Sequence, residues 1–253
     1  MNITRSAALW SVVFLVVGVY LISAESGLAQ SPPGWGEIWQ QRMTIGQAQL
    51  DSAFKLAESG KVNEALAMID QVIATDPNNW RSYFLKSAVL ILAKREGEAL
   101  KEIDTSINLA RRSNVSAGLL AELYESKARS CIDYGRYDEA KKSLEQAVHL
   151  QPADPTTLND LAWMLATSKD SRVRDGRRAV AIAKRACTLS NWKNAFSIDT
   201  LAAASATAGN FADAVKYQQL AISLLDADDR KTQQPGMEQR LRQYSSGQTF
   251  TGI

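Results

Sequence analysis

The sequence predicts an all-α solenoid of about five helix pairs, and three observations support this fold class. A pattern of Gly, a larger apolar residue and Ala recurs along the chain at intervals close to 34 residues. Within each copy, apolar residues are spaced by three and four, as on the buried face of a helix. The 253 residues include only 14 Gly and 6 Pro. This combined share of about 8%, against roughly 12% in average proteins, favours long helices over a turn-rich β fold.

Three segments carry the repeated pattern most clearly, namely Gly60–Pro77, Gly135–Pro152 and Gly209–Asp226. Each begins with Gly, has a larger apolar residue two positions later and has Ala five positions later. Two weaker copies lie between these segments. The five alanines that mark the copies, with spacings of 34, 41, 39 and 35 residues, are Ala65, Ala99, Ala140, Ala179 and Ala214.

Each recurring residue has a physical role within its copy. Gly at the turn can take the left-handed conformation that ends a first helix. The Ala leaves room for two helices to cross closely. Pro77 and Pro152 stop the second helix and direct the chain into the next copy. One helix pair cannot bury its own apolar face, whereas several stacked pairs can.

This pattern resembles the tetratricopeptide repeat family over about residues 46–228. The residues that match best are Gly60, Ala65 and Pro77, and Gly135, Tyr137, Ala140 and Pro152. The chain departs from the family at the turns near Gly97 and Gly176 and lacks Pro after the second, fourth and fifth copies. The resemblance implies a right-handed superhelix whose first helices line a concave groove, which binds extended peptides or protein surfaces. Together with the signal-like N-terminal segment described below, it suggests an exported, envelope-type bacterial member of the family.

We divide the chain accordingly into four parts. Residues 1–29 form an export segment, 30–45 a linker and N-terminal cap, 46–228 the repeat domain, and 229–253 a linker, capping helix and tail. The expected repeats span residues 46–79, 80–113, 121–154, 155–194 and 195–228.

The C-terminal part carries one short apolar stripe. Met237, Leu241 and Tyr244 share a helix face at i, i+4 and i+7, and we expect this face to cap the last repeat beside Leu224 and Leu225. We expect the stretch after it to be loose, with Phe250 as the one residue able to pack against the domain.

The first 29 residues have the order of features found in secretory signals. Arg5 supplies positive charge, residues 6–24 carry no charge, and Gly27 and Ala29 are small residues before an expected cleavage site. The alternative is an uncleaved signal anchor, because a run of 19 uncharged residues approaches the ~20 that span a membrane. In both cases the repeat domain is expected outside the cytoplasm. It would be periplasmic, or tethered to the inner membrane by residues 6–24.

Composition argues against several classes of function. The chain has 29 Lys+Arg and 27 Asp+Glu, a balance that does not indicate nucleic-acid binding. One His and two Cys cannot supply a four-ligand zinc site. His149 is interpreted as a residue at a helix C-terminus, and Cys131 and Cys187 as small buried hydrophobes. We therefore expect no catalytic residues, metal, cofactor or small-molecule substrate.

Analogy with the family gives a candidate groove. Its expected residues are Leu50, Phe54, Arg81, Phe84, Ala88, Glu122, Glu125, Arg129, Asn159, Trp163, Phe196 and Asp199. The aromatic residues Phe54, Phe84 and Trp163 are either exposed anchors for a partner or side chains that pack between helices. Chaperone-binding members of the family hold a C-terminal carboxylate with Lys and Asn. Leu50, Phe54, Glu125 and Trp163 stand in those places here and do not support that specificity.

A basic stretch from Lys169 to Arg185 forms a second candidate surface, with Arg172, Arg174, Arg177 and Arg178 at its centre. It would suit an acidic partner or an anionic lipid surface. The alternative, which we favour, is a solvated loop and helix face.

These observations predict a non-catalytic scaffold that binds another protein or peptide segment in the cell envelope through its groove. Two alternatives stay open. The repeats form a structural module that self-associates through its ends, or they serve as an accessory subunit of an enzyme complex.

Overall fold

The computed structural model describes residues 35–252, with side chains from Gly46 onwards. This range consists of α-helices and connecting turns, without a β-strand. The expected export segment lies outside the described residues. From Trp35 to Gly252, no helix has the combination of length and apolar character that a membrane span requires.

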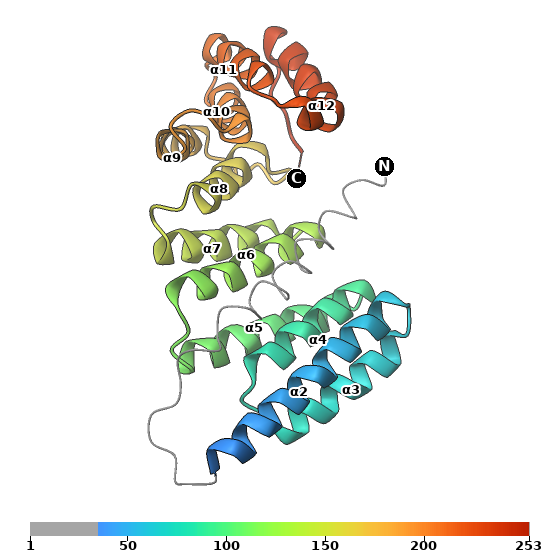
Figure 1. The fold of residues 1–253 in the computed structure, drawn as a ribbon. Helices are drawn as coiled ribbons and strands as arrows, with labels where there is room; N and C mark the ends of the chain where they lie inside the picture. The colour runs from blue at the N-terminus through green and yellow to red at the C-terminus, as the bar shows by residue number, and fades with distance from the viewer. Residues whose placement is uncertain (1–34, 253) are drawn as a thin grey trace. The chain divides into compact units, whose positions relative to one another are not determined.

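The helices follow one another along the chain in the order that the repeats predict (Figure 1). Short turns join them in successive pairs, and one further helix ends the series. The first helices are α2 (Trp35–Glu58), α4 (Trp80–Leu92), α6 (Ala117–Asp133), α8 (Pro155–Thr167) and α10 (Ala195–Thr207). The second helices are α3 (Val62–Thr75), α5 (Glu96–Arg112), α7 (Tyr137–Leu150), α9 (Gly176–Leu189) and α11 (Phe211–Ser223), and α12 (Ala227–Ser245) follows.

The chain divides into two compact bodies, with the boundary between residues 130 and 131. We refer to residues 35–130 as the N-terminal body and to residues 131–252 as the C-terminal body. Each is described by itself below.

The five repeat-marking alanines have no exposed surface, as expected for residues at close helix crossings. Each of them lies in the first turns of a second helix. Within the bodies, α4 packs on α5, α8 on α9 and α10 on α11. The small side chain at each of these positions lets the backbones of two helices approach one another.

The turn glycines adopt the predicted left-handed conformation. Gly60, Gly135 and Gly209 have φ angles of 83°, 71° and 85°. In the second repeat the left-handed residue is Lys94, with φ 58°, five residues before Ala99. Gly97, near which the sequence analysis placed this turn, lies in the first turn of α5 instead. A lysine therefore occupies a conformation that glycine adopts at much lower cost.

Gly176 serves a different purpose in the fourth repeat. A Cβ atom at this position would lie 2.5 Å from the backbone nitrogen of Ala208 and 2.6 Å from the carbonyl carbon of Thr207. The start of α9 thus meets the end of α10 at a distance that only glycine permits. The side chain of Asp175 caps α9 by accepting a hydrogen bond of 3.0 Å from the Arg178 backbone N–H.

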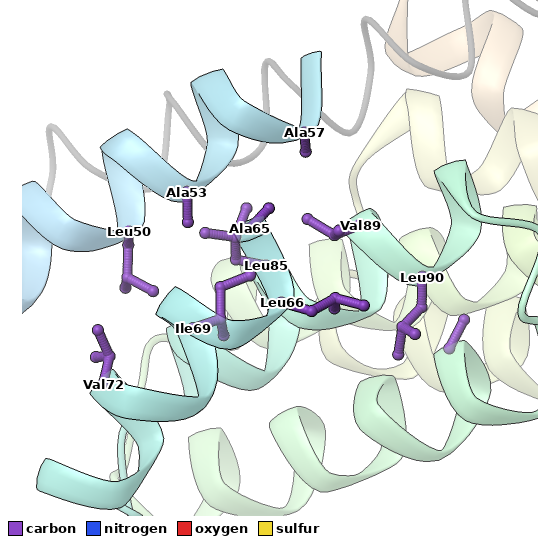
Figure 2. Close-up of a cluster of buried hydrophobic side chains, with 11 residues drawn as sticks. Leu50, Ala53, Ala57, Ala65, Leu66, Ile69, Val72, Leu85, Val89 and Leu90 are labelled. Carbon is purple, nitrogen blue, oxygen red and sulfur yellow. The ribbon is translucent and has the colours of Figure 1, made fainter. Parts of the chain in front are cut away.

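The core of the N-terminal body lies between α2, α3 and α4 (Figure 2). Apolar side chains from all three helices interdigitate there and are almost fully buried. They include Leu50 and Ala53 from α2, Leu66, Ile69 and Val72 from α3, and Leu85, Val89 and Leu90 from α4.

The C-terminal helix is longer than expected. The polar residues from 229 onwards, expected to form a linker, belong to α12. The helix starts early because Asp226 accepts hydrogen bonds from the backbone N–H groups of Asp228 and Asp229. Met237 and Tyr244 are buried, and Met237 packs in one cluster with Leu225, beside the end of the last repeat. Leu224 stays 39% exposed and takes no part in this core.

At the other end, α2 begins at Trp35. Residues 35–45, which the sequence analysis assigned to a linker and cap, therefore continue into the first repeat as one helix.

Candidate functional site

Several groove residues predicted in the N-terminal body are part of its core. Leu50, Phe84 and Ala88 are 1%, 4% and 7% exposed, so these side chains cannot serve as contacts for a ligand. Leu50 packs in the cluster that α2 shares with α3 and α4. Phe54 is half-buried against the same cluster. For Phe54 and Phe84, the structure thus favours packing between helices over exposure as anchors.

Polar groove candidates of the N-terminal body reach the surface on α4 and α6. The Arg81 guanidinium lies over the ring of the buried Trp80, with 4.6 Å between the guanidinium carbon and the ring centroid. On α6, Glu122 is exposed, and Glu125 and Arg129 are half-buried one and two turns further on. These side chains therefore form a charged stripe along one face of α6.

The charges on α6 influence one another. Partial burial and the Glu125 carboxylate raise the pKa of Glu122, and Arg129 opposes this rise. The Nε atom of Arg129 is shielded from solvent and has no hydrogen-bond partner among residues 46–252.

In the C-terminal body, three N-caps set the helices that carry the remaining candidates. Asp154 accepts a hydrogen bond of 2.6 Å from the Thr157 N–H and starts α8, with Pro155 as its first residue. Asn194 caps α10, and Asp226 caps α12. On α8, Leu158, Leu161, Ala162 and Leu165 are buried. Asn159 and Trp163, four residues apart, are half-buried and lie on another side of that helix.

Asp199 forms a buried ion pair and is not available to a ligand. Its side chain, from α10, is 5% exposed. One carboxylate oxygen accepts hydrogen bonds from Arg240 Nε at 3.0 Å and Gln218 Nε2 at 2.7 Å, and the other accepts one from Arg240 Nη2 at 2.7 Å. Burial raises the pKa of Asp199, and Arg240 and Gln218 oppose the rise. The prediction that Asp199 lines an open groove is therefore wrong.

Arg240, held by Asp199, connects α12 to two aromatic rings. Its guanidinium carbon lies 5.5 Å from the ring centroid of Trp163 and 5.3 Å from that of Phe250. The Trp163 and Phe250 ring centroids are 5.9 Å apart, with 44° between the ring planes. These distances are typical of cation–π and tilted aromatic contacts.

Residues 246–252, which we call the tail, return from α12 to α8 (Figure 1). Gly247 takes a left-handed conformation with φ 71°, and the Gln248 N–H donates to the carbonyl of Gln243 at 2.9 Å. This turn ends α12 and reverses the chain. The Gly252 N–H then donates to the carbonyl of Thr167, the last residue of α8, at 3.0 Å. A docked tail replaces the loose tail that the sequence analysis expected.

The end of α8 needs such a donor, because the last carbonyls of a helix have no partner within it. The Asp175 N–H bonds the carbonyl of Leu165, and the Thr207 hydroxyl bonds that of Ala166. The tail supplies the donor for Thr167. These carbonyls are thus satisfied by residues distant along the chain.

Two further polar and apolar groups adjoin this part of the C-terminal body. The Asn159 Oδ1 atom is shielded from solvent and has no hydrogen-bond partner within the described chain. Phe196, at the start of α10, is 40% exposed. Asn159, Trp163 and Phe196 thus remain candidates for partner contacts.

The basic stretch is used mainly for local structure. Arg172 pairs with Asp170 at 2.7 Å and lowers the pKa of that carboxyl to about 2, chiefly through its side-chain hydrogen bond. Arg174 donates to the carbonyl of Ser168 at 2.7 Å, and Arg178 pairs with Glu145 at 2.6 Å. Arg177 is exposed. These contacts favour the interpretation as a solvated, self-paired surface.

The remaining candidates lie where simple packing puts them. His149 is exposed in the last turn of α7. Cys131 and Cys187 are buried free thiols, and burial raises the pKa of Cys187 to about 11. Among the side chains described, from residue 46 to 252, His, Cys, Asp and Glu form no cluster of three or more placed to hold a metal ion.

The residues missed by the sequence analysis are Arg240 and Thr167. The direction in which the Arg240 side chain points depends on where α12 begins, which the sequence analysis did not predict. Thr167 takes part through its backbone carbonyl, which every residue has. The sequence offered one indication of this contact, namely Phe250, an aromatic residue in the polar stretch after Ser245.

The fold and its site define a helical-repeat protein with an intramolecular segment seated on a first helix. A family model described as the tetratricopeptide repeat matches residues 121–154, and the chain has the fold of tetratricopeptide repeat proteins. The resemblance noted in the sequence is confirmed to that extent.

Known proteins show the same relationship. The solved structure of YrrB, a TPR protein, superposes with a TM-score of 0.57 at 14% identity, over 81% of this chain and 98% of YrrB. The STIP1 homolog of Dictyostelium discoideum is 29% identical over 133 residues, and the DnaJ homolog subfamily C member 7 homolog of Schizosaccharomyces pombe is 23% identical over 216 residues. These matches cover 51% and 77% of this chain, and 22% and 44% of the relatives' own lengths.

Proposed function

We propose that this protein is a non-catalytic scaffold that binds segments of another protein through the exposed faces of its first helices. The observation that carries the proposal is the seated tail, because an extended segment of chain already contacts α8 through a ring and a backbone hydrogen bond. The YrrB structure, which has the same fold, is described as having an unusual peptide-binding site, and this supports the proposal.

The charged stripe on α6 provides a second contact region of different chemistry. Glu122 and Glu125 would attract a basic group of a partner, and Arg129 would attract an acidic group. The charged stripe on α6 and the aromatic contacts on α8 together favour a protein surface as the ligand over a small molecule.

We further propose that the repeat domain acts outside the cytoplasm, in the cell envelope. The support is the sequence order of Arg5, an uncharged stretch at residues 6–24 and small residues before Gln30. Mass spectrometry of the mature protein would test this. A chain beginning at Gln30 indicates cleavage, a chain retaining residues 6–24 in the membrane fraction indicates an anchor, and a wholly cytoplasmic protein contradicts the proposal.

The binding proposal is tested by quantitative affinity capture with single variants. Trp163→Ala and Arg129→Glu should each reduce recovery of a specific partner. Trp192→Ala and Arg111→Glu are matched controls, since both replaced residues are exposed and lie outside the first helices. If all four variants recover the same partners as the wild type, binding through the first helices is wrong.

A further inference from the structure

The tail makes contacts that the end of the repeats does not need. The last repeat is already covered by α12, which packs on α11 and buries Met237 and Tyr244. The tail instead crosses from α12 to α8, the first helix of the preceding repeat. There it contacts Trp163 and Thr167, and it also contacts Arg240 of α12. Its placement therefore calls for an explanation other than capping.

Only two chemical features of the tail are used in this contact. The Phe250 ring lies against Trp163 and Arg240, and the Gly252 N–H donates to the Thr167 carbonyl. Gln248, Thr249 and Thr251 are exposed. An extended segment with an aromatic side chain and a glycine two residues later offers the same two features. A Cβ atom at Gly252 would lie 2.3 Å from the Phe250 ring, so this arrangement requires glycine there.

The surface under the tail is held in place by other parts of the body. Asp199 fixes the Arg240 guanidinium through two hydrogen bonds, and Gln218 holds Asp199 in turn. Trp163 belongs to α8, which is anchored in the core by Leu158, Leu161, Ala162 and Leu165. Because these supports do not involve the tail, the surface is preorganised for a replacement ring.

We propose that Trp163, Arg240 and the Thr167 carbonyl form a binding site for an extended segment of a partner protein, with an aromatic residue two positions before a glycine whose backbone N–H is free. The tail is the built-in competitor for this site. The inference rests on the proposed scaffold function and specifies the ligand and the regulation of one of its surfaces.

The competition follows from the covalent connection. A short connection between Ser245 and Phe250 gives the tail an effective concentration on the order of mM, although its contacts are few. A partner must displace it, so the apparent dissociation constant rises in inverse proportion to the fraction of molecules with the tail released.

The experiment uses the full chain and a fluorescent synthetic peptide with the sequence of residues 246–253. In the Phe250→Ala variant the tail is released, and the peptide should bind about tenfold more tightly than to the wild type, as expected for the loss of one aromatic and one cation–π contact by the competitor. Thr251→Ala is the control, because this side chain is exposed in the same tail. It should bind the peptide as weakly as the wild type.

Changes in the peptide test its two recognised features. A peptide with Ala in place of Phe250 should bind the Phe250→Ala protein at least about tenfold more weakly. A peptide with glycolate in place of Gly252, which replaces the amide N–H by an ester oxygen and adds no Cβ atom, should do the same. Adding Trp163→Ala to this protein should have the same effect. Equal binding of all three peptides would overturn the proposal.

A second variant guards against unfolding or an alternative mode of binding. A chain that ends at Ser245 should retain its helical circular dichroism and bind the peptide as the Phe250→Ala variant does. Failure of both folded variants to bind overturns the proposal. A wild-type protein whose mass doubles with concentration, and whose Phe250→Ala variant stays monomeric, would also overturn it, because the tail would then join two copies.

These results are separable from the test of the scaffold function. If neither variant binds the peptide but Arg129→Glu still removes a captured partner, the scaffold function stands and the tail-site inference fails. If the peptide binds but no first-helix variant alters capture, the site recognises the tail sequence and the scaffold function fails.

Discussion

The two bodies of the molecule carry the same repeat features and present different first-helix surfaces. In the N-terminal body, the aromatic candidate Phe84 is buried in the core, and the exposed surface is the charged stripe on α6. In the C-terminal body, Trp163 stays at the surface and is contacted by the tail. The comparison teaches that the repeat sets which helices pair, whereas the residues between its marker positions set what each surface can bind.

The largest expected effect lies at the ion pair between Asp199 and Arg240 in the C-terminal body. Replacing Arg240 with Met leaves Asp199 buried without a cation, and should lower the free energy of unfolding by about 3–5 kcal/mol at pH 7. Urea unfolding measures this loss.

The pH dependence of this loss has a definite sign. Burial raises the folded-state pKa of Asp199 above its unfolded value, and removing Arg240 raises it further. The folded variant therefore binds a proton more readily than the unfolded chain, so the loss is full above the folded-state pKa and shrinks as pH falls through it. Arg242→Met, on the exposed side of α12, is the control and should be nearly neutral. Equal losses in both variants would contradict the assigned role of Asp199.

The close approach of α9 to α10 is the next largest expected effect. Gly176→Ala places a Cβ atom within 2.5 Å of the Ala208 backbone nitrogen and should destabilise the protein by about 2 kcal/mol, because the backbones must separate. Gly97→Ala in the N-terminal body is the matched control, since a Cβ there meets nothing within 4 Å. It should be neutral or slightly stabilising. Thermal unfolding of both variants shows whether close packing or helix propensity determines the effect of replacing each glycine.

The turns of the two bodies should respond to substitution with opposite signs. Lys94→Gly in the N-terminal body should stabilise the protein by about 1 kcal/mol, because Lys94 has a left-handed φ of 58°. Gly209→Ala in the C-terminal body should cost about 1 kcal/mol for the same reason, since Gly209 has φ 85°. Chemical denaturation of both variants tests this pair. A destabilised Lys94→Gly variant would show that the lysine has another role.

The thiols of the C-terminal body should show the smallest effect. Cys187 is fully buried with its pKa raised to about 11, and Cys131 is equally buried, so neither should react with iodoacetamide at pH 8 in the folded protein. Mass spectrometry before and after denaturation measures labelling. Rapid labelling of the native protein would mean that one of these sites opens.

Features that depend on neighbours in sequence could be predicted well. The buried alanines and the left-handed glycines follow from the geometry of one helix pair, which a 34-residue pattern contains. Lys94 was not identified because a lysine carries no turn signal, although it lies five residues before Ala99, as Gly60 does before Ala65.

Features that depend on distant contacts could not be predicted. Leu50 and Phe84 lie on first helices that bury surface against more than one neighbour, so their periodicity does not separate core from groove. Asp199 looked available because its partner Arg240 comes 41 residues later. The Thr167 carbonyl has no sequence signature at all.

The most direct test of the central claim, that the tail occupies the α8 surface through Phe250, is amide hydrogen exchange at Gly252. Because this N–H donates to the Thr167 carbonyl, it should exchange slowly in the wild type and in Thr251→Ala. In Phe250→Ala it should exchange at the rate of a free peptide. Equal protection in Phe250→Ala, or no protection in the wild type, would contradict the account.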